Sequence, residues 1–519
     1  MKYRKKPLII FEMANNHMGS VEHGKKIINK LKEQSLPYDF ECAVKFQYRD
    51  LDTFIHPDYK NRMDIKFIKR FTETRLREED YLELKSECEK VGFKTICTPF
   101  DEVSVAKIIK HNYDYLKVAS CSIKDWPLLE EICKTNMPVI ASTGGASLDD
   151  VDKIVSLFHH NNINLKLMHC VGIYPTANED LQLNRIDWFQ DRYKNIEIGF
   201  STHESPDQLL AVAVAIGKGT MIFEKHVGVE DKTQGYELNA YSANPDQIGR
   251  WLSVINQCIK ICGEKEKENY QSKKEELVGL VDLKRGVYAK EKILDGAEFA
   301  QNNVFFAMPV TQGQMTSEDF SKHNNEFTSE KNYNEKDAIN SYSIKKPNID
   351  NISKSNIIHK IMAQLNQARI VINKGSAIEL SHHYGIENIE NTGAVLIDCI
   401  NEEYCKKILV MVPGQSHPEH YHIKKKESFQ VLWGEMELDH KSVKKICYPG
   451  DIVTIDKNEK HSFSTKTGVI FEEVSTTAFS NDSIYSDEKI NNNPNRKTVS
   501  YTHLRAHETP EHLVCRLLL

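Results

Sequence analysis

At 519 residues the chain exceeds what one hydrophobic core usually supports, so about two to four domains are expected. The net charge of −6, without a long basic block, argues against nucleic acid as a main partner, and no apolar run reaches the roughly 18 residues that span a membrane. The 12 cysteines are scattered without CxxC pairs, so we expect reduced thiols in a cytoplasmic protein.

The first half of the chain contains eight short apolar runs that each end on polar residues. Such runs are typical of parallel strands covered on both faces, and helix-like stretches separate them. This alternation predicts an α/β fold, a closed (β/α)8 TIM barrel over residues 1–265, with its chemistry at the carboxyl ends of the strands. The run-ending residues are Glu12, Lys45, Thr98, Lys117 with Ser120, Ser142, His169, Ser201 with His203, and Lys225 with His226. We therefore expect an enzyme.

Two histidines end the seventh and eighth runs, His203 in GFSTHESPD and His226 in FEKHVG. Adjacent parallel strands lie about 4.8 Å apart, so both imidazoles could reach one divalent ion. An ion with only two protein ligands keeps open positions for water and a substrate oxygen, which suits catalysis. The alternative is that one of the histidines only packs or hydrogen-bonds within the fold.

Two lysines, Lys45 and Lys117, end otherwise apolar runs. A lysine that points into a barrel mouth needs an anionic partner, and a bound phosphate or carboxylate is the natural one. Hydroxyl groups from neighbouring run ends complete a cradle for a small, doubly anionic ligand: Thr98, Ser120, Ser142 and Ser201. The alternatives are internal salt bridges for the lysines and strand-end capping for the hydroxyls.

Composition marks further segments after the barrel. Residues 264–276 are highly charged and typical of a solvated linker, and residues 280–345 carry short alternating runs that predict a small second domain. The polar, Asn-rich residues 321–355 are either a second linker or the ragged end of that domain. Residues 499–519 do not continue this organisation and are interpreted as non-native sequence.

The last third, residues 356–490, has a helix-like stretch followed by β-type runs and predicts an all-β jelly roll. Its motif residues follow the two-part cupin spacing: Gly414, His420, His422, Glu427 and Gly434, then Gly450 and His461. His-x-His on one strand puts both rings on one face, and a hairpin brings Glu427 and His461 alongside. This ligand set suits Mn, Fe, Zn or Ni. The alternative is a metal-free sugar-binding jelly roll.

The barrel motifs resemble those of the sialic acid synthases (N-acetylneuraminate synthases). The matching stretches are FEMANNHMGS, AVKFQ, ICTPF, YLKVAS, PVIASTGG, HCVGIYPT, GFSTHESPD and IFEKHVG, in the family's order. The resemblance covers roughly residues 7–250 and extends more weakly over 283–320, which resembles the family's antifreeze-like (SAF) domain. The cupin region resembles D-lyxose isomerases and related sugar isomerases.

The resemblance implies a transferase that condenses phosphoenolpyruvate with an N-acetylated amino-sugar aldehyde. The product would be a nine-carbon 2-keto sugar acid for surface polysaccharide biosynthesis. The resemblance also implies that His203 and His226 hold Mn or Mg and that Glu12 polarises metal-bound water as a base. Tyr174 would line the same barrel mouth. The implied phosphoenolpyruvate pocket consists of Lys45, Thr98, Lys117, Ser120, Ser142 and Ser201. A homodimer in which the small domain covers the partner's barrel is also implied.

Two departures from the family pattern leave the acceptor sugar open. Ser122 stands where better-known members place an acidic residue, and Met308 stands where they often carry an arginine before proline. Two alternative functions remain for the whole chain. The cupin, as a sugar isomerase or epimerase, could be the main activity, or the protein could be a non-catalytic sugar-binding module.

Overall fold

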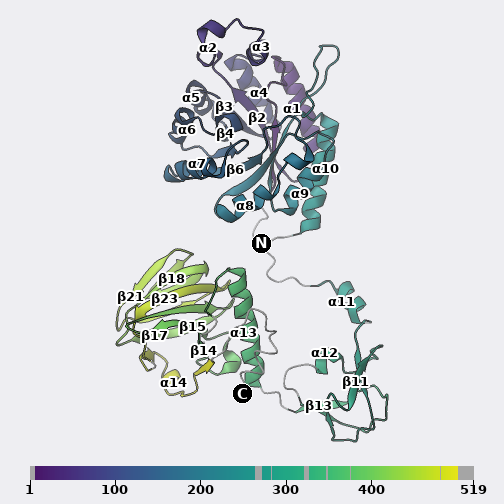
Figure 1. The fold of residues 1–519 in the computed structure, drawn as a ribbon, viewed down its shortest axis with the longest axis vertical. Helices are drawn as coiled ribbons and strands as arrows, with labels where there is room; N and C mark the ends of the chain where they lie inside the picture. The colour runs from purple at the N-terminus through teal and green to yellow at the C-terminus, as the bar shows by residue number, and fades with distance from the viewer. Residues whose placement is uncertain are drawn as a thin grey trace. The chain divides into compact units, whose positions relative to one another are not determined.

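The computed structural model describes residues 6–263, 272–281, 283–320, 326–345, 349–373, 376–479 and 481–500. The chain divides into two compact units, Met1–Tyr270 and Gln271–Leu519, and each is described by itself (Figure 1).

The first unit is a closed barrel of eight parallel strands (Figure 1). Each strand pairs with the next along the chain, and the last pairs with the first. The strands are β1 (Leu8–Glu12), β2 (Glu41–Tyr48), β3 (Lys94–Pro99), β4 (Tyr115–Val118), β5 (Val139–Ser142), β6 (Leu165–Cys170), β7 (Glu197–Thr202) and β8 (Ile222–His226). The predicted (β/α)8 barrel is confirmed.

Helices follow the strands and cover the outside of the barrel. They are α1 (Val21–Ser35), α4 (Glu78–Lys90), α5 (Glu102–Lys110), α6 (Trp126–Cys133), α7 (Leu148–His160), α8 (Asn184–Arg192), α9 (Leu210–Gly217) and α10 (Pro245–Cys262). Capping side chains set several starts: Ser147 accepts a hydrogen bond from the backbone N–H of Asp150 at α7, and Asn244 does the same for Gln247 at α10. Such caps satisfy N–H groups that a helix leaves unpaired.

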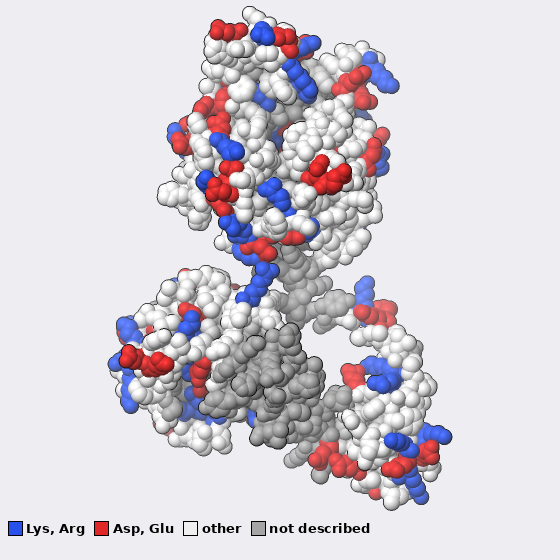
Figure 2. All heavy atoms as spheres, viewed as in Figure 1, with Lys and Arg blue, Asp and Glu red and all other residues white. Residues whose placement is uncertain are grey.

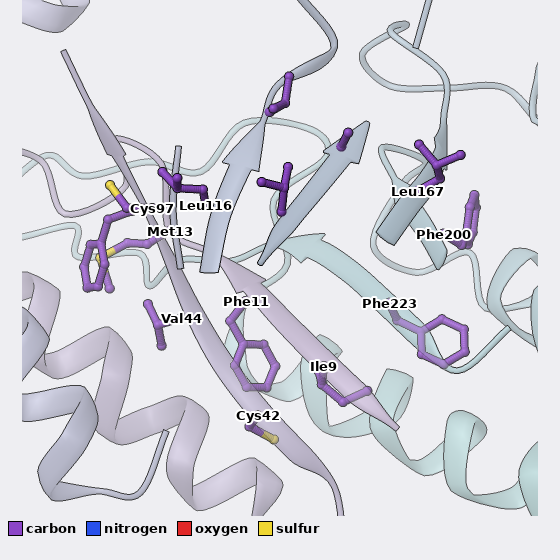
Figure 3. Packing of buried hydrophobic residues seen from close by; sticks show 14 of the residues in the cluster. Ile9, Phe11, Met13, Cys42, Val44, Cys97, Leu116, Leu167, Phe200 and Phe223 are labelled. Carbon is purple, nitrogen blue, oxygen red and sulfur yellow. The ribbon is translucent and has the colours of Figure 1, made fainter. Parts of the chain in front are cut away.

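Side chains of the barrel strands alternate between two layers. Ile9 and Phe11 of β1 point outward and pack in the core between strands and helices, as Figure 3 shows. Leu8 and Ile10 point inward and, together with Met168 of β6, fill the floor of the barrel. Glu12 continues the inward row of β1 at its carboxyl end.

One connection on the carboxyl side of the barrel is long. Between β2 and α4 the chain forms α2 (Leu51–Phe54), a 3₁₀ turn (Pro57–Tyr59) and α3 (Lys66–Glu73). Sequence patterns did not predict these short helices. Over the face of the barrel unit seen in Figure 2, Lys and Arg side chains are intermixed with Asp and Glu, in keeping with the small net charge.

The second unit begins with α11 (Lys274–Val281) and a small β domain. Its strands are β9 (Gly286–Ala289), β10 (Glu298–Phe299), β11 (Val304–Ala307), β12 (Glu326–Ser329) and β13 (Tyr342–Lys345), with the one-turn helix α12 (Ser317–Phe320). β9 pairs with β11, and β12 lies between β10 and β13. Val287, Phe299 and Phe327 belong to its own hydrophobic core.

The rest of the second unit has α13 (Ile349–Gln367) and two antiparallel sheets, the arrangement of a cupin jelly roll. The seven-stranded sheet contains β21 (Ile452–Ile455), β18 (Glu427–Gly434), β23 (Val469–Thr476), β16 (Tyr404–Met411), β15 (Ala394–Asn401), β14 (Ile378–Ser381) and β25 (Lys497–Ser500). The five-stranded sheet contains β20 (Val443–Cys447), β19 (Met436–His440), β22 (His461–Ser464), β17 (Ser416–His422) and β24 (Ser483–Tyr485). A short helix, α14 (Glu488–Asn491), precedes β25.

Several predicted boundaries shift in the structure. α11 occupies the end of the predicted linker at 264–276, and α13 begins before residue 356. Residues 326–345 pair within the small domain, so this part of the Asn-rich stretch is not a linker. β25 pairs with β14, so the tail predicted as non-native from residue 499 starts inside a strand. Residues 501–519 lie outside the described residues.

Two bulk predictions concern membranes and cysteines. In the described parts of the chain, no helix has the length and apolar character needed to cross a membrane. Each described cysteine is free, as the scattered cysteine pattern predicted.

Candidate functional site

A cavity of about 650 Å³ opens at the carboxyl ends of the barrel strands. It is lined by every barrel residue that the sequence singled out for a site: Glu12, Lys45, Thr98, Lys117, Ser120, Ser142, Tyr174, Ser201, His203 and His226. Strand register explains the convergence, because Glu12 of β1 lies opposite Lys45 of β2 on one side and His226 of β8 on the other. The predicted residues therefore share one hollow.

The two lysines form a buried charge network with two carboxylates. Lys45 contacts Glu12 directly and lies 2.9 Å from Oε1 of Glu224, and Lys117 Nζ lies 3.5 Å from the other oxygen of Glu224. The internal salt bridges that were the alternative to anion binding by the lysines therefore exist, and they lie in the wall of the cavity. A ligand in this cavity meets two ammonium groups that are already fixed in place.

Burial and pairing set the charges of this network. Burial raises the pKa of Glu12, with Lys45 acting against it. Burial would also raise the pKa of Glu224, but Lys117 and Lys45 outweigh it and hold that pKa well below its usual value. For Lys45 the carboxylates outweigh burial and raise the pKa, whereas burial lowers the pKa of Lys117. Glu224 is therefore the firmly ionised carboxylate of the site.

Sequence reasoning missed Glu224. It precedes His226 by two positions in MIFEKH, and residues two apart on a strand share a face. Ser201 on β7 donates a hydrogen bond to it at 3.1 Å. The signal was available: an inward-facing His226 requires that Glu224 also faces inward.

Two residues at the ends of the apolar runs, His169 and Lys225, were expected at the barrel mouth but do not line the cavity. Side chains alternate along a strand, so each of these residues points away from the cavity while its neighbour points into it. His169 faces away from the cavity and donates through Nε2 to the backbone oxygen of Leu181 at 2.7 Å. Lys225 is fully buried outside the cavity, 3.0 Å from Glu204. In each case the neighbour in sequence, Cys170 or His226, lines the cavity instead.

Hydroxyl groups surround the lysines. Lys117 donates to Ser142 Oγ at 2.6 Å, and Ser120 Oγ accepts from the backbone N–H of Gly144 at 3.1 Å. Oγ1 of Thr98 is buried and has no hydrogen-bond partner among the residues that the structure describes. A buried polar atom without a partner is costly, so a ligand atom at this position would satisfy it.

His203 and His226 lie side by side, with ring centroids 5.3 Å apart. His203 donates through Nδ1 to the backbone oxygen of Val171 at 2.8 Å, which leaves the lone pair of Nε2 free. Burial lowers the pKa of both imidazoles, so they are neutral at neutral pH. Tyr174 packs 4.2 Å from the His203 ring. Two neutral imidazoles, one of them with its tautomer fixed by the Val171 carbonyl, fit a divalent metal.

The cupin motif residues also converge. His420 and His422 of β17, Glu427 of β18 and His461 of β22 are all buried, and one ligand atom from each lies within 4.8 Å of the others. Nδ1 of each histidine faces a backbone oxygen: Pro418 for His420 at 3.1 Å, Asp482 for His422 at 3.3 Å and Glu459 for His461 at 3.2 Å. Nε2 of His422 and Nε2 of His461 lie 3.5 and 3.0 Å from the carboxylate of Glu427. This grouping of imidazoles and a carboxylate could hold a metal ion.

The cavity around the cupin cluster is small, about 40 Å³. Lys425 is buried in its wall, 2.6 Å from Oε2 of Glu427 and 2.7 Å from Oε1 of Glu473. This volume holds an ion with one or two small ligands.

Comparisons with known proteins match both the barrel and the cupin region. A model of the NeuB family matches residues 41–267, and a cupin domain model matches residues 407–472. An uncharacterized protein of Methanocaldococcus jannaschii is 30% identical over 58% of this chain and 84% of its own length. The N-acetylneuraminate-9-phosphate synthase of Homo sapiens is 26% identical over 56% of this chain and 79% of its own.

One similar solved structure is a putative spore coat polysaccharide biosynthesis protein E from Chromobacterium violaceum. It is 43% identical, covers 65% of this chain and 100% of its own, and superposes with a TM-score of 0.62. The chain belongs to the NeuB family of synthases.

Proposed function

We propose that the barrel condenses phosphoenolpyruvate with an N-acetylated amino-sugar aldehyde, giving a nine-carbon 2-keto sugar acid and phosphate. The observation that carries this proposal is the meeting of two neutral imidazoles and two ammonium groups in one cavity of about 650 Å³. Cavities of about 300–1,000 Å³ are usual for small-molecule sites. Membership of a synthase family supports the reaction class.

Lys45, Lys117 and the hydroxyls of Ser120, Ser142 and Ser201 would bind the phosphate and carboxylate of phosphoenolpyruvate. The lysines would supply positive charge, and the hydroxyls would donate directional hydrogen bonds that orient the ligand. Thr98 would donate its unpaired hydroxyl to the same ligand. Because Glu224 already holds both ammonium groups, the site is preorganised and little reorganisation accompanies binding.

His203 and His226 would hold a divalent ion, Mn or Mg. When bound there, the ion supplies a Lewis acid that polarises the aldehyde oxygen. Tyr174 and Tyr241 pack against the two imidazoles and restrict the space in which the sugar lies.

In the proposed reaction the electron pair of the C2–C3 double bond of phosphoenolpyruvate forms a bond from C3 to the aldehyde carbon. The aldehyde oxygen becomes an alkoxide that takes up a proton, and C2 is left as an oxocarbenium ion. Water then adds at C2, and phosphate leaves with cleavage of its C–O bond, which produces the 2-keto group. Glu12 would take the proton from that water, since burial raises its pKa and the backbone N–H of Ala14 fixes its carboxylate at 2.7 Å. Lys45, in contact with Glu12, would balance the charge during this step.

Phosphate release from phosphoenolpyruvate, measured with several N-acetylated hexosamines and with Mn or Mg, tests the proposal. His203→Ala and His226→Ala should each lower kcat/KM by about a hundredfold or more, because a metal ligand is lost. His160→Ala, an exposed histidine on α7, is the control. No phosphate release with any acceptor in the presence of metal would overturn the proposal.

The small domain and the oligomer are proposed by resemblance. The segment 283–320 would be an antifreeze-like (SAF) domain that covers the barrel of a partner in a homodimer. Met308 is exposed at the position where the family often has arginine, so the domain would shield the site and not grip the sugar.

The cupin cluster favours a second candidate function, a metal-dependent sugar isomerase or epimerase of the D-lyxose isomerase type. Its His420, His422, Glu427 and His461 would hold Mn, Fe, Zn or Ni. The full chain should then bind two metal ions, and His420→Ala with His461→Ala should remove one of them without slowing phosphate release. Aldose–ketose conversion that is lost in this double variant would establish the isomerase; metal binding without conversion would favour a binding module.

A further inference from the structure

Arg49 holds an unusual position at the rim of the barrel cavity. It directly follows β2, and its guanidinium carbon lies 4.1 Å from the ring centroid of Phe71 and 3.6 Å from that of Phe100. Stacking on two aromatic faces fixes the plane of the guanidinium. Only its edges, which carry the N–H groups, remain for a partner.

Within the described residues, Arg49 lacks such a partner. Nε of Arg49 is buried without a hydrogen bond, and among the described residues no carboxylate forms an ion pair with this guanidinium. Burial lowers the pKa of Arg49 to about 10, so it stays charged at neutral pH. Arg49 is half-buried, and a charge so shielded from water without a counter-ion indicates that a ligand supplies the anion.

Two further cations line the same cavity from α3. Lys66 and Arg70 are four residues apart, so they share one face of the helix. In the described part of the chain neither forms an ion pair. The neighbouring Arg62 and Arg75 differ, since they pair with Asp64 and Asp52 and do not line this cavity.

The cavity thus has two cationic regions. At the strand ends, Lys45 and Lys117 face the carboxylates of Glu12 and Glu224 and would receive phosphoenolpyruvate. At the rim, Arg49, Lys66 and Arg70 form no ion pair with a carboxylate in the described ranges of the chain. If the aldehyde of the acceptor lies at His203 and His226, the opposite end of the acceptor points toward the open rim of the cavity. A second anion there would complete the charge balance.

We propose that Arg49, Lys66 and Arg70 form a subsite for a phosphate ester on the acceptor sugar, at the end remote from the aldehyde. This rests on the proposed synthase function. A dianionic phosphate ester matches three cations, and the fixed edge of a guanidinium binds two phosphate oxygens at once. The acceptor class is therefore an N-acetylhexosamine 6-phosphate, and the product retains the phosphate.

The test compares N-acetylmannosamine and N-acetylglucosamine with their 6-phosphates, using the full chain, phosphoenolpyruvate and Mn. The phosphorylated member of the productive pair should have a KM lower by about 10- to 100-fold, the range expected for hydrogen bonds to a charged group. Arg49→Gln and Arg70→Gln should each remove most of this difference and leave the KM of phosphoenolpyruvate and the turnover of the unphosphorylated sugar unchanged.

Arg62→Gln and Lys69→Gln are matched controls from the same connection, outside the cavity, and should change nothing. Arg70 is only half-buried, so its variant keeps the test valid if Arg49→Gln does not fold. Equal KM for both acceptors, or variants that raise the KM of phosphoenolpyruvate, would overturn the subsite while the synthase stands.

If no acceptor releases phosphate, the synthase proposal fails by itself. Calorimetry with the 6-phosphates then decides the subsite: binding that is weakened in Arg70→Gln supports it, and absence of binding overturns it.

Discussion

Glu224 shows how one side chain sets the charge of a catalytic cavity. It lies between two ammonium groups, 2.9 Å from Lys45 and 3.5 Å from Lys117, and is almost fully buried. Removing one member of a buried ion pair usually costs more than the pair contributes, because the remaining charge has no partner. Removal of Glu224 would leave the ammonium groups of both Lys45 and Lys117 without this partner.

We expect Glu224→Gln to lower the free energy of unfolding by about 3–5 kcal/mol. Phosphoenolpyruvate should restore part of this loss, because its anionic groups replace the missing carboxylate. The rise in Tm on adding phosphoenolpyruvate should therefore be larger in the variant than in the wild type, as measured by scanning calorimetry.

Glu204→Gln is the matched control, since Glu204 also pairs with a buried lysine, Lys225 at 3.0 Å, but outside the cavity. Glu204→Gln should also lower the free energy of unfolding, but the rise in its Tm on adding phosphoenolpyruvate should be no larger than in the wild type. Equal ligand shifts in Glu224→Gln and the wild type would contradict the assigned role.

Strand alternation is the element-level feature that builds the site. Inward residues at the amino ends of the strands are apolar and fill the floor, whereas inward residues at the carboxyl ends are charged or hydroxylic. This division needs close packing below the site. Gly199 of β7 is part of it, because a Cβ there would lie 2.2 Å from Sδ of Met168 and 2.9 Å from Cβ of Ile222.

Gly199→Ala should lower the free energy of unfolding by about 1–3 kcal/mol, the usual cost of overpacking a core. Urea denaturation would measure the loss. Gly217→Ala, at the end of α9 with no atom within 4 Å of the added Cβ, should be neutral or slightly stabilising. If both variants were equally stable, the floor would not be tightly packed at β7.

The short helices α2 and α3 mark the limit of element prediction. Helices of 4 and 8 residues are marginal on their own and depend on tertiary contacts. Sequence patterns therefore did not predict the residues of these helices that line the cavity, although they predicted the flanking strands β2 and β3.

Over the whole molecule, buried neutral histidines occur in both compact units. Burial lowers the pKa of His17 in the barrel unit to about 4 and that of His383 in the cupin to about 3. In an unfolded chain the same imidazoles have a pKa of about 6.5. The unfolded state therefore binds more protons than the folded state below that pH.

Stability of the metal-free protein should be full above pH 6.5 and should fall as the pH decreases toward 4. Each such histidine contributes a loss of about 1.4 kcal/mol per pH unit in this window. Calorimetry between pH 7.5 and 4.5 checks the slope. His17→Asn should flatten it for the barrel unit, whereas the exposed His160→Asn should not; a constant Tm down to pH 5 would contradict the prediction.

Patterns along the chain were sufficient for the barrel, for most of the residues at its strand ends and for the grouping of three histidines and a glutamate in the cupin. Apolar runs, their spacing and a His-x-His pair are local features, and strand geometry carries them directly into three dimensions. Alternation along β8 turns Glu224 inward, but its place between the two lysines, like the cationic rim, came from packing. Glu224 meets Lys45 and Lys117, and Arg49 meets Phe71 and Phe100, through contacts between residues distant in sequence. Such partners depend on how the barrel closes and on where α3 packs, and no local pattern encodes either.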